Sequence, residues 1–381
     1  MKKLLGFVIL GLLSFNVLAE EFNLSSAKTQ LVNDNINVAI AYQNYVSVEE
    51  HARVKALQLL PTLTIDMLIA NYQYTILRSV IPEPTRFFDA KAAKDLAEAA
   101  NINRTIVKKN LLEDLEKTYF MFQFHKETVS SLTSELAIKK VIADRSQEAY
   151  DLGSIKFDEY YSVQRDLVAA QSNLVNANEI LKTDEYALKL ILQVNNLSEF
   201  DLILENLYNG TLSFPVDTNE AMNIAVNNSK EIEQYDWLIA AAKNTKTGVA
   251  VSWISWNGVG FDYFARVSIA KTEVTKLQLQ KTKSTIELKN QVAAMYVEIS
   301  KLQEKVVYQN QLLQMAKDNY AQALANNNDQ LATLITVKKA ELSLLNSERD
   351  SRRLDYELEF KFIKLKRILG TNMITNEIPK A

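Results

Sequence analysis

The chain has 381 residues with 8 Gly, 5 Pro and no Cys, and its 43 basic and 46 acidic residues give a formal net charge of −3. Average usage would place about 27 Gly and about 19 Pro in such a chain. This scarcity excludes an all-β sandwich, a glycine-loop nucleotide enzyme and a disordered chain, while the lack of Cys excludes disulfides and thiolate metal sites. Nothing in the charge favours a nucleic-acid partner. The composition instead predicts very long helices.

The first 19 residues are typical of a secretory signal peptide. Lys2 and Lys3 precede an apolar run over residues 4–15, and Val17 and Ala19 are the small or short residues expected before a cleavage after Ala19. The run has about 12 clearly apolar residues, fewer than the ~20 of a membrane-spanning helix. We therefore expect an exported protein whose mature chain starts at residue 20 and has no transmembrane helix.

The remaining chain contains one unit twice. At a shift of 177 residues, Tyr119 aligns with Tyr296 and the run 188–192 aligns with 365–369. Upstream, residues 35–45 resemble 221–231 at a shift of 186, so the two copies differ in length in the region that precedes the long helix. The chain is accordingly divided into a first repeat (20–192), a linker (193–219), a second repeat (220–370) and a C-terminal tail (371–381).

Each repeat begins with a short helix and ends with a long helical hairpin. The short helices are predicted over 35–60 and 220–246, and the hairpins over 90–192 and 268–369. Apolar residues recur every three, four or seven positions along the first long helix, as in coiled coils. A helix of about 57 residues would be about 85 Å long, more than a compact domain needs.

Between the short helix and the hairpin, each repeat has a stretch with the alternation of β-strands. Residues 62–88 predict one strand pair and residues 249–267 another, with Asn257-Gly258 as a two-residue hairpin turn. Two separate hairpins are not stable alone and need partner strands. Trp253 and Trp256 lie in the second pair, and we expect both near a membrane interface with at most one facing lipid, since residues three apart on a strand point to opposite sides. The alternative is packing beneath the strands.

The two helical hairpins are predicted to turn at the same end of the molecule. Gly153 suits the left-handed conformation that follows a helix end. The second turn has no glycine, although Asn tolerates the same backbone region. The residues of the two turns are Tyr150, Asp151, Leu152, Gly153 and Ser154 in the first, and Asn326, Asn327, Asn328 and Asp329 in the second.

Taken together, these features resemble the outer membrane efflux protein family, the TolC-like channels. The resemblance rests on Leu59-Leu60-Pro61 before the first strand, on residues 148–153 at the first turn and on Ile368-Leu369-Gly370 at the close of the second hairpin. It implies a mainly α fold with a small β part. The duplicated long helical hairpins would form an α-barrel tunnel, and four short strands would contribute to a trimeric 12-stranded β-barrel.

The resemblance also implies a function and partners. A homotrimer in the outer membrane lipid, extending into the periplasm, would be the passive exit duct of a tripartite efflux pump or type I secretion system. Its partners would be a periplasmic adaptor (membrane fusion) protein and an inner-membrane pump. The turn residues Tyr150 to Ser154 and Asn326 to Asn328 would be the docking tips, and Asp329 is the candidate gate residue.

Two readings from other classes remain open. A strand needs about 9 to 11 residues to cross a bilayer, and the second hairpin barely reaches this, so the chain could be a periplasmic trimeric coiled-coil protein without a full pore. A periplasmic adaptor is a further alternative, but adaptors carry one helical hairpin between β-rich segments. We expect no enzyme, cofactor or metal site, since His51 and His125 lie in no metal-ligand spacing. No motif indicates the substrate.

Overall fold

The structure is a computed structural model that describes residues 23–60, 82–194, 203, 205–207, 214–215, 217–254, 260–328 and 333–370. In this part the chain is almost entirely helical. The first repeat contains α1 (Leu24–Asp34), α2 (Ile36–Leu57), α5 (Pro84–Asp151) and α6 (Phe157–Leu192). The second contains α7 (Thr218–Asn228), α8 (Lys230–Val251), the short 3₁₀ helix η1 (Ser252–Ile254), α9 (Tyr263–Asn328) and α10 (Leu334–Ile368).

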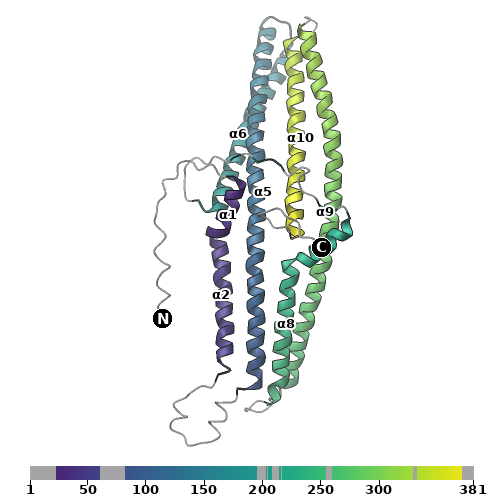
Figure 1. Cartoon of the computed structure of the whole chain (residues 1–381). Coiled ribbons are helices and arrows are strands. Elements are labelled where there is room, and N and C mark those ends of the chain that lie inside the picture. The colour runs from purple at the N-terminus through teal and green to yellow at the C-terminus, as the bar shows by residue number, and fades with distance from the viewer. Residues whose placement is uncertain are drawn as a thin grey trace, which may run out of the picture.

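The helices form a long layer in which α5 and α9 run through both halves (Figure 1). Helix α5 has 68 residues and is therefore about 100 Å long. In one half of the layer the order is α6, α5, α10, α9, and in the other half it is α2, α5, α8, α9. The turn from α5 to α6 and the turn from α9 to α10 lie at the same end, as the sequence predicts.

Matching helix lengths confirm the internal repeat. Helices α1 and α7 each have 11 residues, α2 and α8 each have 22, α5 and α9 have 68 and 66, and α6 and α10 have 36 and 35. The prediction of a single helix over 220–246 is wrong in one respect, because the helix is interrupted at Ser229 and continues as α8. Helix α1 was not predicted. The true equivalents Ile36 and Lys230 lie 194 positions apart, not 186.

Polar caps explain the break that the sequence reading missed. Asn35 precedes α2 and Ser229 precedes α8, each with an extended backbone. The Asn35 side chain accepts a hydrogen bond from the Asn37 N–H at 2.8 Å, and the Ser229 hydroxyl accepts one from the Ile232 N–H at 3.2 Å. Both side chains satisfy a free amide at the start of a helix and thereby start a new helix in a new direction.

The stretches predicted as strands are partly helical in the described residues. Helix α8 runs to Val251 and η1 covers 252–254, while α9 begins at Tyr263 and α5 already at Pro84, so 249–254, 263–267 and 84–88 are helical. A lone chain offers these segments no neighbouring strand, and a two-stranded hairpin is marginal without one. The Asn257-Gly258 turn and residues 62–81 lie outside the described residues. For these the β part of the fold stays a prediction.

Each repeat has its own hydrophobic core at the middle of the layer. The first core joins α1, α5 and α6 around the fully buried Leu115, Tyr119 and Leu188, and Tyr356 and Ile363 of α10 reach into it. The second core joins α7, α9 and α10. Of the apolar positions predicted along α5, Leu112, Leu115, Tyr119 and Phe122 are confirmed as core. Val129, Leu132 and Leu136, nearer the tips, are only partly buried.

Candidate functional site

The first turn closes with a regular helix-ending motif. Helix α5 ends at Asp151, and Gly153 takes the predicted left-handed conformation with φ of +69°. The Ser154 N–H donates to the Ala149 carbonyl and the Gly153 N–H donates to the Tyr150 carbonyl, both at 2.8 Å. This is the Schellman pattern, which satisfies the last carbonyls of the helix. These hydrogen bonds fix the backbone of the turn and hold its side chains in a defined orientation.

An exposed aromatic cluster lies at this turn. Tyr150 stacks on Tyr160 with ring centroids 5.0 Å apart, and Phe157 stacks on Tyr161 at 6.0 Å. Phe157 is 58% exposed, and Leu152 beside the turn is 81% exposed. Large apolar side chains at the tip of a polar hairpin are unusual unless another surface covers them. The sequence reading placed Tyr150 here but missed the contribution of α6.

The second turn differs from the first. The reading placed Asn326, Asn327 and Asn328 in the turn, but they form the last residues of α9. Thr333 caps α10, since its hydroxyl accepts a hydrogen bond from the Thr336 N–H at 3.3 Å. The gate candidate Asp329 lies outside the described residues.

A groove lies between the two hairpins near the tips. Its volume is about 550 Å³, and it is lined by α5, α6 and α10. Its apolar lining includes Ile142, Val163 and Leu342, while Asp158 and Glu159 stand on the α6 side. Ser146 is buried at this groove, and its hydroxyl has no hydrogen-bond partner among the described residues. The groove thus offers apolar surface with carboxylates on the α6 side and two lysines, Lys139 of α5 and Lys339 of α10, elsewhere in its lining.

Acids on α5 face bases and a phenol on α10 along the seam between the hairpins. The contacts, from the tips towards the middle, are Arg349 with Glu135 (2.7 Å), Tyr356 with Glu127 (2.7 Å), Lys366 with Glu116 (2.8 Å) and Arg367 with Glu113 (3.1 Å). Burial raises the pKa of the Glu135 carboxyl, but the hydrogen bonds from Lys139 and Arg349 outweigh it and hold that pKa below its usual range. The hairpins are therefore joined by directional, charge-assisted contacts.

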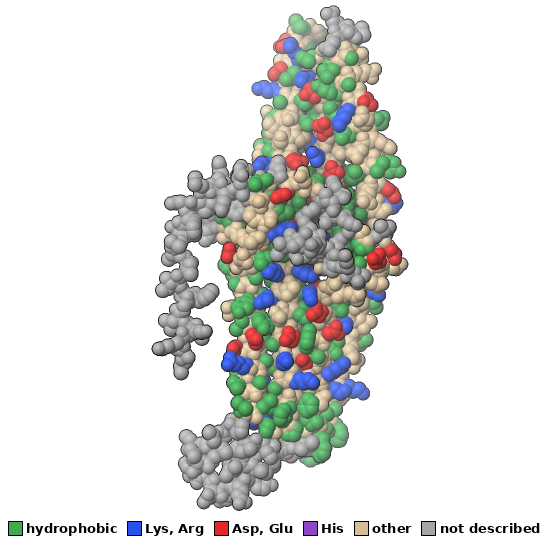
Figure 2. Space-filling view, in the orientation of Figure 1, with side chains coloured by type: hydrophobic (Ala, Val, Ile, Leu, Met, Phe, Trp, Pro, Cys, Tyr) green, Lys and Arg blue, Asp and Glu red, His purple; other side chains and the backbone are tan. Residues whose placement is uncertain are grey.

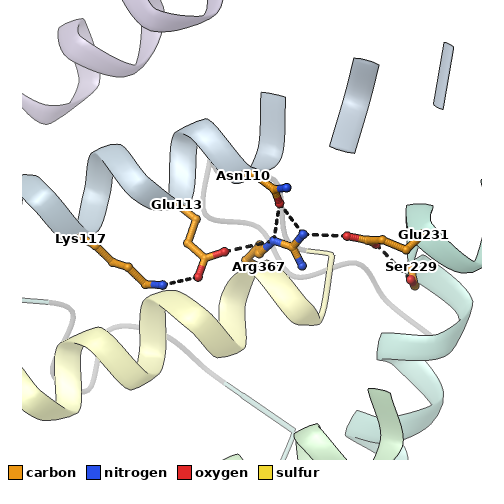
Figure 3. Close-up of polar contacts among 6 residues, drawn as sticks. All are labelled: Asn110, Glu113, Lys117, Ser229, Glu231 and Arg367. Atoms are coloured by element: carbon orange, nitrogen blue, oxygen red, sulfur yellow. Dashed lines mark hydrogen bonds and ion pairs between the residues drawn. The ribbon is translucent and has the colours of Figure 1, made fainter. Parts of the chain in front are cut away.

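Arg367 connects three helices at the middle of this seam (Figure 3). Its guanidinium donates to Asn110 of α5 at 3.0 Å and to Glu231 of α8 at 2.7 Å, in addition to its pair with Glu113. Glu113 also pairs with Lys117 at 2.5 Å. Because a guanidinium has donors in a fixed planar fork, one side chain can hold α5, α10 and the start of α8 together.

Next to it lies a fully buried ionic cluster. Glu116 of α5 contacts Lys28 of α1 and, at 2.8 Å, Lys366 of α10, and all three side chains are almost inaccessible to solvent. Burial lowers the pKa of Lys366, while Glu116 and the buried Glu359 act in the opposite direction. A buried charge is tolerated only when it is paired in this way. The cluster fixes α1, α5 and α10 at the midpoint of the layer.

The repeated tyrosines hold the linker between the repeats. The Tyr119 hydroxyl donates to the Ile203 carbonyl, and the Tyr296 hydroxyl donates to the Pro215 carbonyl at 2.8 Å. Both carbonyls belong to the linker, so the two aligned tyrosines hold the linker in addition to packing in the core. Gln123 adds a two-point contact with the Glu205 backbone at 2.9 and 3.1 Å.

The hydroxyl of Tyr296 gives a pH-dependent stability. Burial, with Glu220 and Asp217 nearby, raises its pKa from 10.0 to about 12. The unfolded chain loses this proton first, so the contribution is complete below pH 10 and is lost as pH rises to about 12. We expect Tyr296→Phe to cost about 1 kcal/mol at pH 8 and to weaken the loss of stability between pH 10 and pH 12. Melting followed by circular dichroism tests this, and equal pH slopes in both proteins would contradict it.

The other residues singled out in the sequence have no common site. Trp253 lies in η1 and is 58% exposed, at the end opposite the turns, and Trp256 lies outside the described residues. His125 contacts Asp184 of α6, and His51 is exposed on α2. Within the described ranges, no group of three His, Asp or Glu side chains is arranged to hold a metal ion. No described helix combines the length and apolar character needed to cross a membrane.

A duplicated pair of long helical hairpins with both turns at one end is the fold of TolC-like outer membrane efflux channels. The outer membrane channel CmeC of Campylobacter jejuni gives a TM-score of 0.72 at 12% identity, over 94% of this chain and 90% of that chain. The channel-forming protein CusC gives 0.74 at 11% identity, over 95% of each chain. The outer membrane protein VceC of Vibrio cholerae gives 0.69 at 13% identity, over 91% of this chain and 96% of that chain. No protein-family model and no curated protein matches the sequence.

These likenesses confirm the predicted fold. The sequence reading missed the seam between α5 and α10 and the buried cluster around Glu116. The available signal was weak, a charged pair inside the apolar run 365–369, where Lys366 and Arg367 stand among leucine and isoleucine. A lysine in such a run requires a buried acid, but the sequence does not say which of the many glutamates supplies it.

Proposed function

We propose that this chain is the outer membrane exit duct of a tripartite efflux pump or a type I secretion system. The signal peptide over residues 1–19 would export it, and three copies would surround a tunnel through the periplasm. The helices would form the tunnel wall, and the segments outside the described residues at the far end would supply the strands of the membrane barrel. Conduction would be passive, with energy supplied by an inner-membrane pump.

The observation that supports this proposal is the exposed apolar surface on the two edge helices, α6 and α9. In the tip-side half of the layer, α6 packs on α5 and α9 packs on α10, and no described helix covers their outer faces. Exposed apolar residues on α6 follow steps of four, seven or eleven: Phe157, Tyr161, Val168, Val175, Tyr186 and Leu190. The same kind of step links Val297, Tyr308 and Met315 on the part of α9 that lies beside α10. Such steps keep each set on one helical face.

Two different uncovered stripes favour a closed ring of copies. The α6 stripe cannot reach the α9 stripe of its own chain, because α5 and α10 stand between them. A contact between α9 of one copy and α6 of the next is heterologous, and such contacts close into rings when the rotation permits. The three-fold number comes from the resemblance to TolC-like channels, and four helices per copy then make a wall of twelve.

The tips supply the docking surface in this proposal. The aromatic cluster around Tyr150 and Phe157, with the exposed Leu152, would meet a periplasmic adaptor protein, and Asn326 to Asn328 would contribute from the second hairpin. The groove beside the tips suits a partner helix with an apolar face and with basic residues opposite the carboxylates of α6. Asp329 remains the candidate gate residue, where three carboxylates would meet on the axis of a trimer.

Planar bilayer recording of the purified mature protein tests the duct. Stable conductance steps from a folded trimer support it. A trimer that folds, binds membranes and never conducts would contradict it and favour the alternative, a periplasmic trimeric coiled-coil protein whose short hairpins form no full pore. The helical state of residues 249–254 and 263–267 is the observation that keeps this alternative in view.

A single charge on the α6 stripe should prevent the ring from forming. Val175 is 66% exposed in the single chain, so we expect Val175→Asp to place an unpaired carboxylate in each contact and to yield monomers that keep their helical circular dichroism. Ile180→Asp is the matched control, since Ile180 is 46% exposed on the same helix but points about 140° away from Val175 around the helix axis. Light scattering after gel filtration measures the mass. Trimeric V175D, or equal loss in both variants, would refute the stripe as the contact.

A further inference from the structure

The end of the layer opposite the turns has exposed aromatic side chains. Phe261 is fully exposed, Phe264 is 81% exposed and Trp253 is 58% exposed. Phe87, in the first turn of α5, is also exposed, and Figure 2 shows hydrophobic side chains gathered at this end. Large apolar side chains clustered on an exposed surface mark a contact with another phase or molecule.

Lysines from four helices lie at one level just above this apolar end. Three contacts between helices set the level. Asn244 of α8 donates to Asp95 of α5 at 2.6 Å, Tyr263 of α9 donates to the Ala250 carbonyl of α8 at 2.7 Å, and Arg86 of α5 donates to the Gln58 carbonyl at 3.2 Å. The lysines are Lys55 on α2, Lys91 and Lys94 on α5, Lys243 and Lys246 on α8, and Lys271 on α9. We call these six residues the basic band.

The basic band is not neutralised within the described part of the chain. None of its six lysines has a carboxylate within ion-pair distance there, whereas acids at this level are engaged elsewhere. Glu50 pairs with Arg53 at 3.5 Å, Glu273 pairs with Lys276 at 3.6 Å, and the buried Asp95 accepts the hydrogen bond from Asn244. Asp89 is an exposed acid at this level without such a pair, and Glu83 and Glu98 lie at the two edges of the level, so the six lysines still outnumber the unpaired acids.

The spacing between the two features fits a lipid interface. Lys91 and Lys94 lie seven and ten residues after Pro84, so they are about 10 to 15 Å above the first residue of α5. Aromatic rings favour the boundary between acyl chains and headgroups, and lysine stems reach from there to the phosphates. We infer that this end of the helical layer binds anionic phospholipid headgroups through the basic band, with the exposed aromatics at the membrane interface.

This inference rests on the proposed function, which places this end at the outer membrane. It does not depend on whether the strands form a complete pore, because every residue named belongs to the helices or their ends. A second copy stacked end to end is not a suitable occupant, since it would bring an identical positive band against the first. Attraction to an anionic leaflet is the interaction that both the aromatics and the lysines favour.

Lipid-dependent melting of the full mature chain tests the assignment. In uncharged detergent, we expect added phosphatidylglycerol to raise the melting temperature by several degrees more than the same amount of phosphatidylcholine. Salt at 0.5 M should remove most of this difference, because the Debye length is then about 4 Å. Changing Lys91, Lys94, Lys243 and Lys246 to Gln should abolish this difference. The matched control changes the exposed lysines Lys140, Lys305, Lys317 and Lys339 to Gln, on the tip-side parts of α5, α9 and α10, and should retain it.

Equal shifts of the melting temperature with the two lipids in the unaltered protein would overturn the inference. A control variant that loses the difference between the lipids while the band variant keeps it would also overturn it. A soluble polyanion that raised the melting temperature as much as phosphatidylglycerol would also overturn it and would point to a polymer-binding surface. With Trp237 and Trp256 changed to Phe, brominated phosphatidylglycerol should quench Trp253, and no quenching would count against the interface. Conductance in neutral bilayers is measured separately. A protein that does not conduct but keeps its response to phosphatidylglycerol would contradict the proposed exit duct and leave the lipid-binding inference standing.

Discussion

Glu116→Gln should be among the most destabilising single substitutions in the chain, at about 3 to 5 kcal/mol of unfolding free energy. The change leaves the ammonium groups of Lys28 and Lys366 buried against a neutral amide, although both face the Glu116 carboxylate in the native protein. Removing the anion also lowers the pKa of Lys366 further. The lysine of the unfolded chain titrates near 10.5, so above the lowered pKa of folded Lys366 the unfolded state binds more protons than the folded state. The stability lost in the variant should therefore be partly regained as pH rises towards 10.5.

Glu298→Gln is the control for this prediction. Glu298 of α9 pairs with Lys361 of α10 at 2.6 Å, so the same substitution again breaks a pair between two helices. Both side chains are well exposed, and exposed pairs are worth less than about 1 kcal/mol. Urea denaturation of both variants at pH 7 and at pH 9.5 measures the contrast. A similar cost for the two, or a deficit for E116Q that grows with pH, would show that the buried cluster does not hold the midpoint.

Gly370→Ala should cost about 2 to 5 kcal/mol through two separate effects. Gly370 has φ of +75°, where any side chain is strained. A Cβ there would also lie 2.6 Å from the Asn228 Cβ and 3.1 Å from the Asn228 carbonyl oxygen. Because Asn228 ends α7, the clash would push α7 away from the end of α10 and open the second core.

Gly153→Ala separates these effects. Gly153 has φ of +69°, but nothing lies within 4 Å of the Cβ that alanine would add. Its cost should therefore be the conformational term alone, about 1 to 2 kcal/mol. Denaturant midpoints of the two variants, measured side by side, give the difference. A Gly153→Ala cost that equals or exceeds that of Gly370→Ala would contradict the role of the contact with Asn228.

Local sequence signals predicted the helices well. The long seam of apolar residues and the scarcity of glycine gave the two hairpins, because a heptad pattern depends only on nearby residues. Gly153 was placed correctly for the same reason, since a left-handed residue after a helix end favours glycine. The first repeat shows the limit of that rule. Gln193, aligned with Gly370, has φ of +56° without being glycine, and its side chain is used to accept a hydrogen bond from the Ile36 N–H at 2.8 Å.

Contacts between distant segments could not be predicted. The charged seam pairs residues more than 200 positions apart, such as Glu135 with Arg349, and many other glutamates and arginines satisfy the same local rules. The break at Ser229 was missed because serine inside an apolar pattern is usually a solvated helix position. The boundaries of the strand stretches depend on partner strands, which a single sequence does not display.

The buried cluster around Glu116 divides the longest helix into two nearly equal arms. Glu116 lies 32 residues from Pro84 and 35 residues from Asp151, so each arm is about 50 Å long. The accompanying helices all end or begin near this level, while α5 and α9 continue through it. A continuous helix held firmly at its centre behaves as a balanced lever. If the layer turns as one body about this cluster, a sideways displacement of the tips would move the opposite end by a comparable distance in the reverse direction, which would couple the two ends of the molecule.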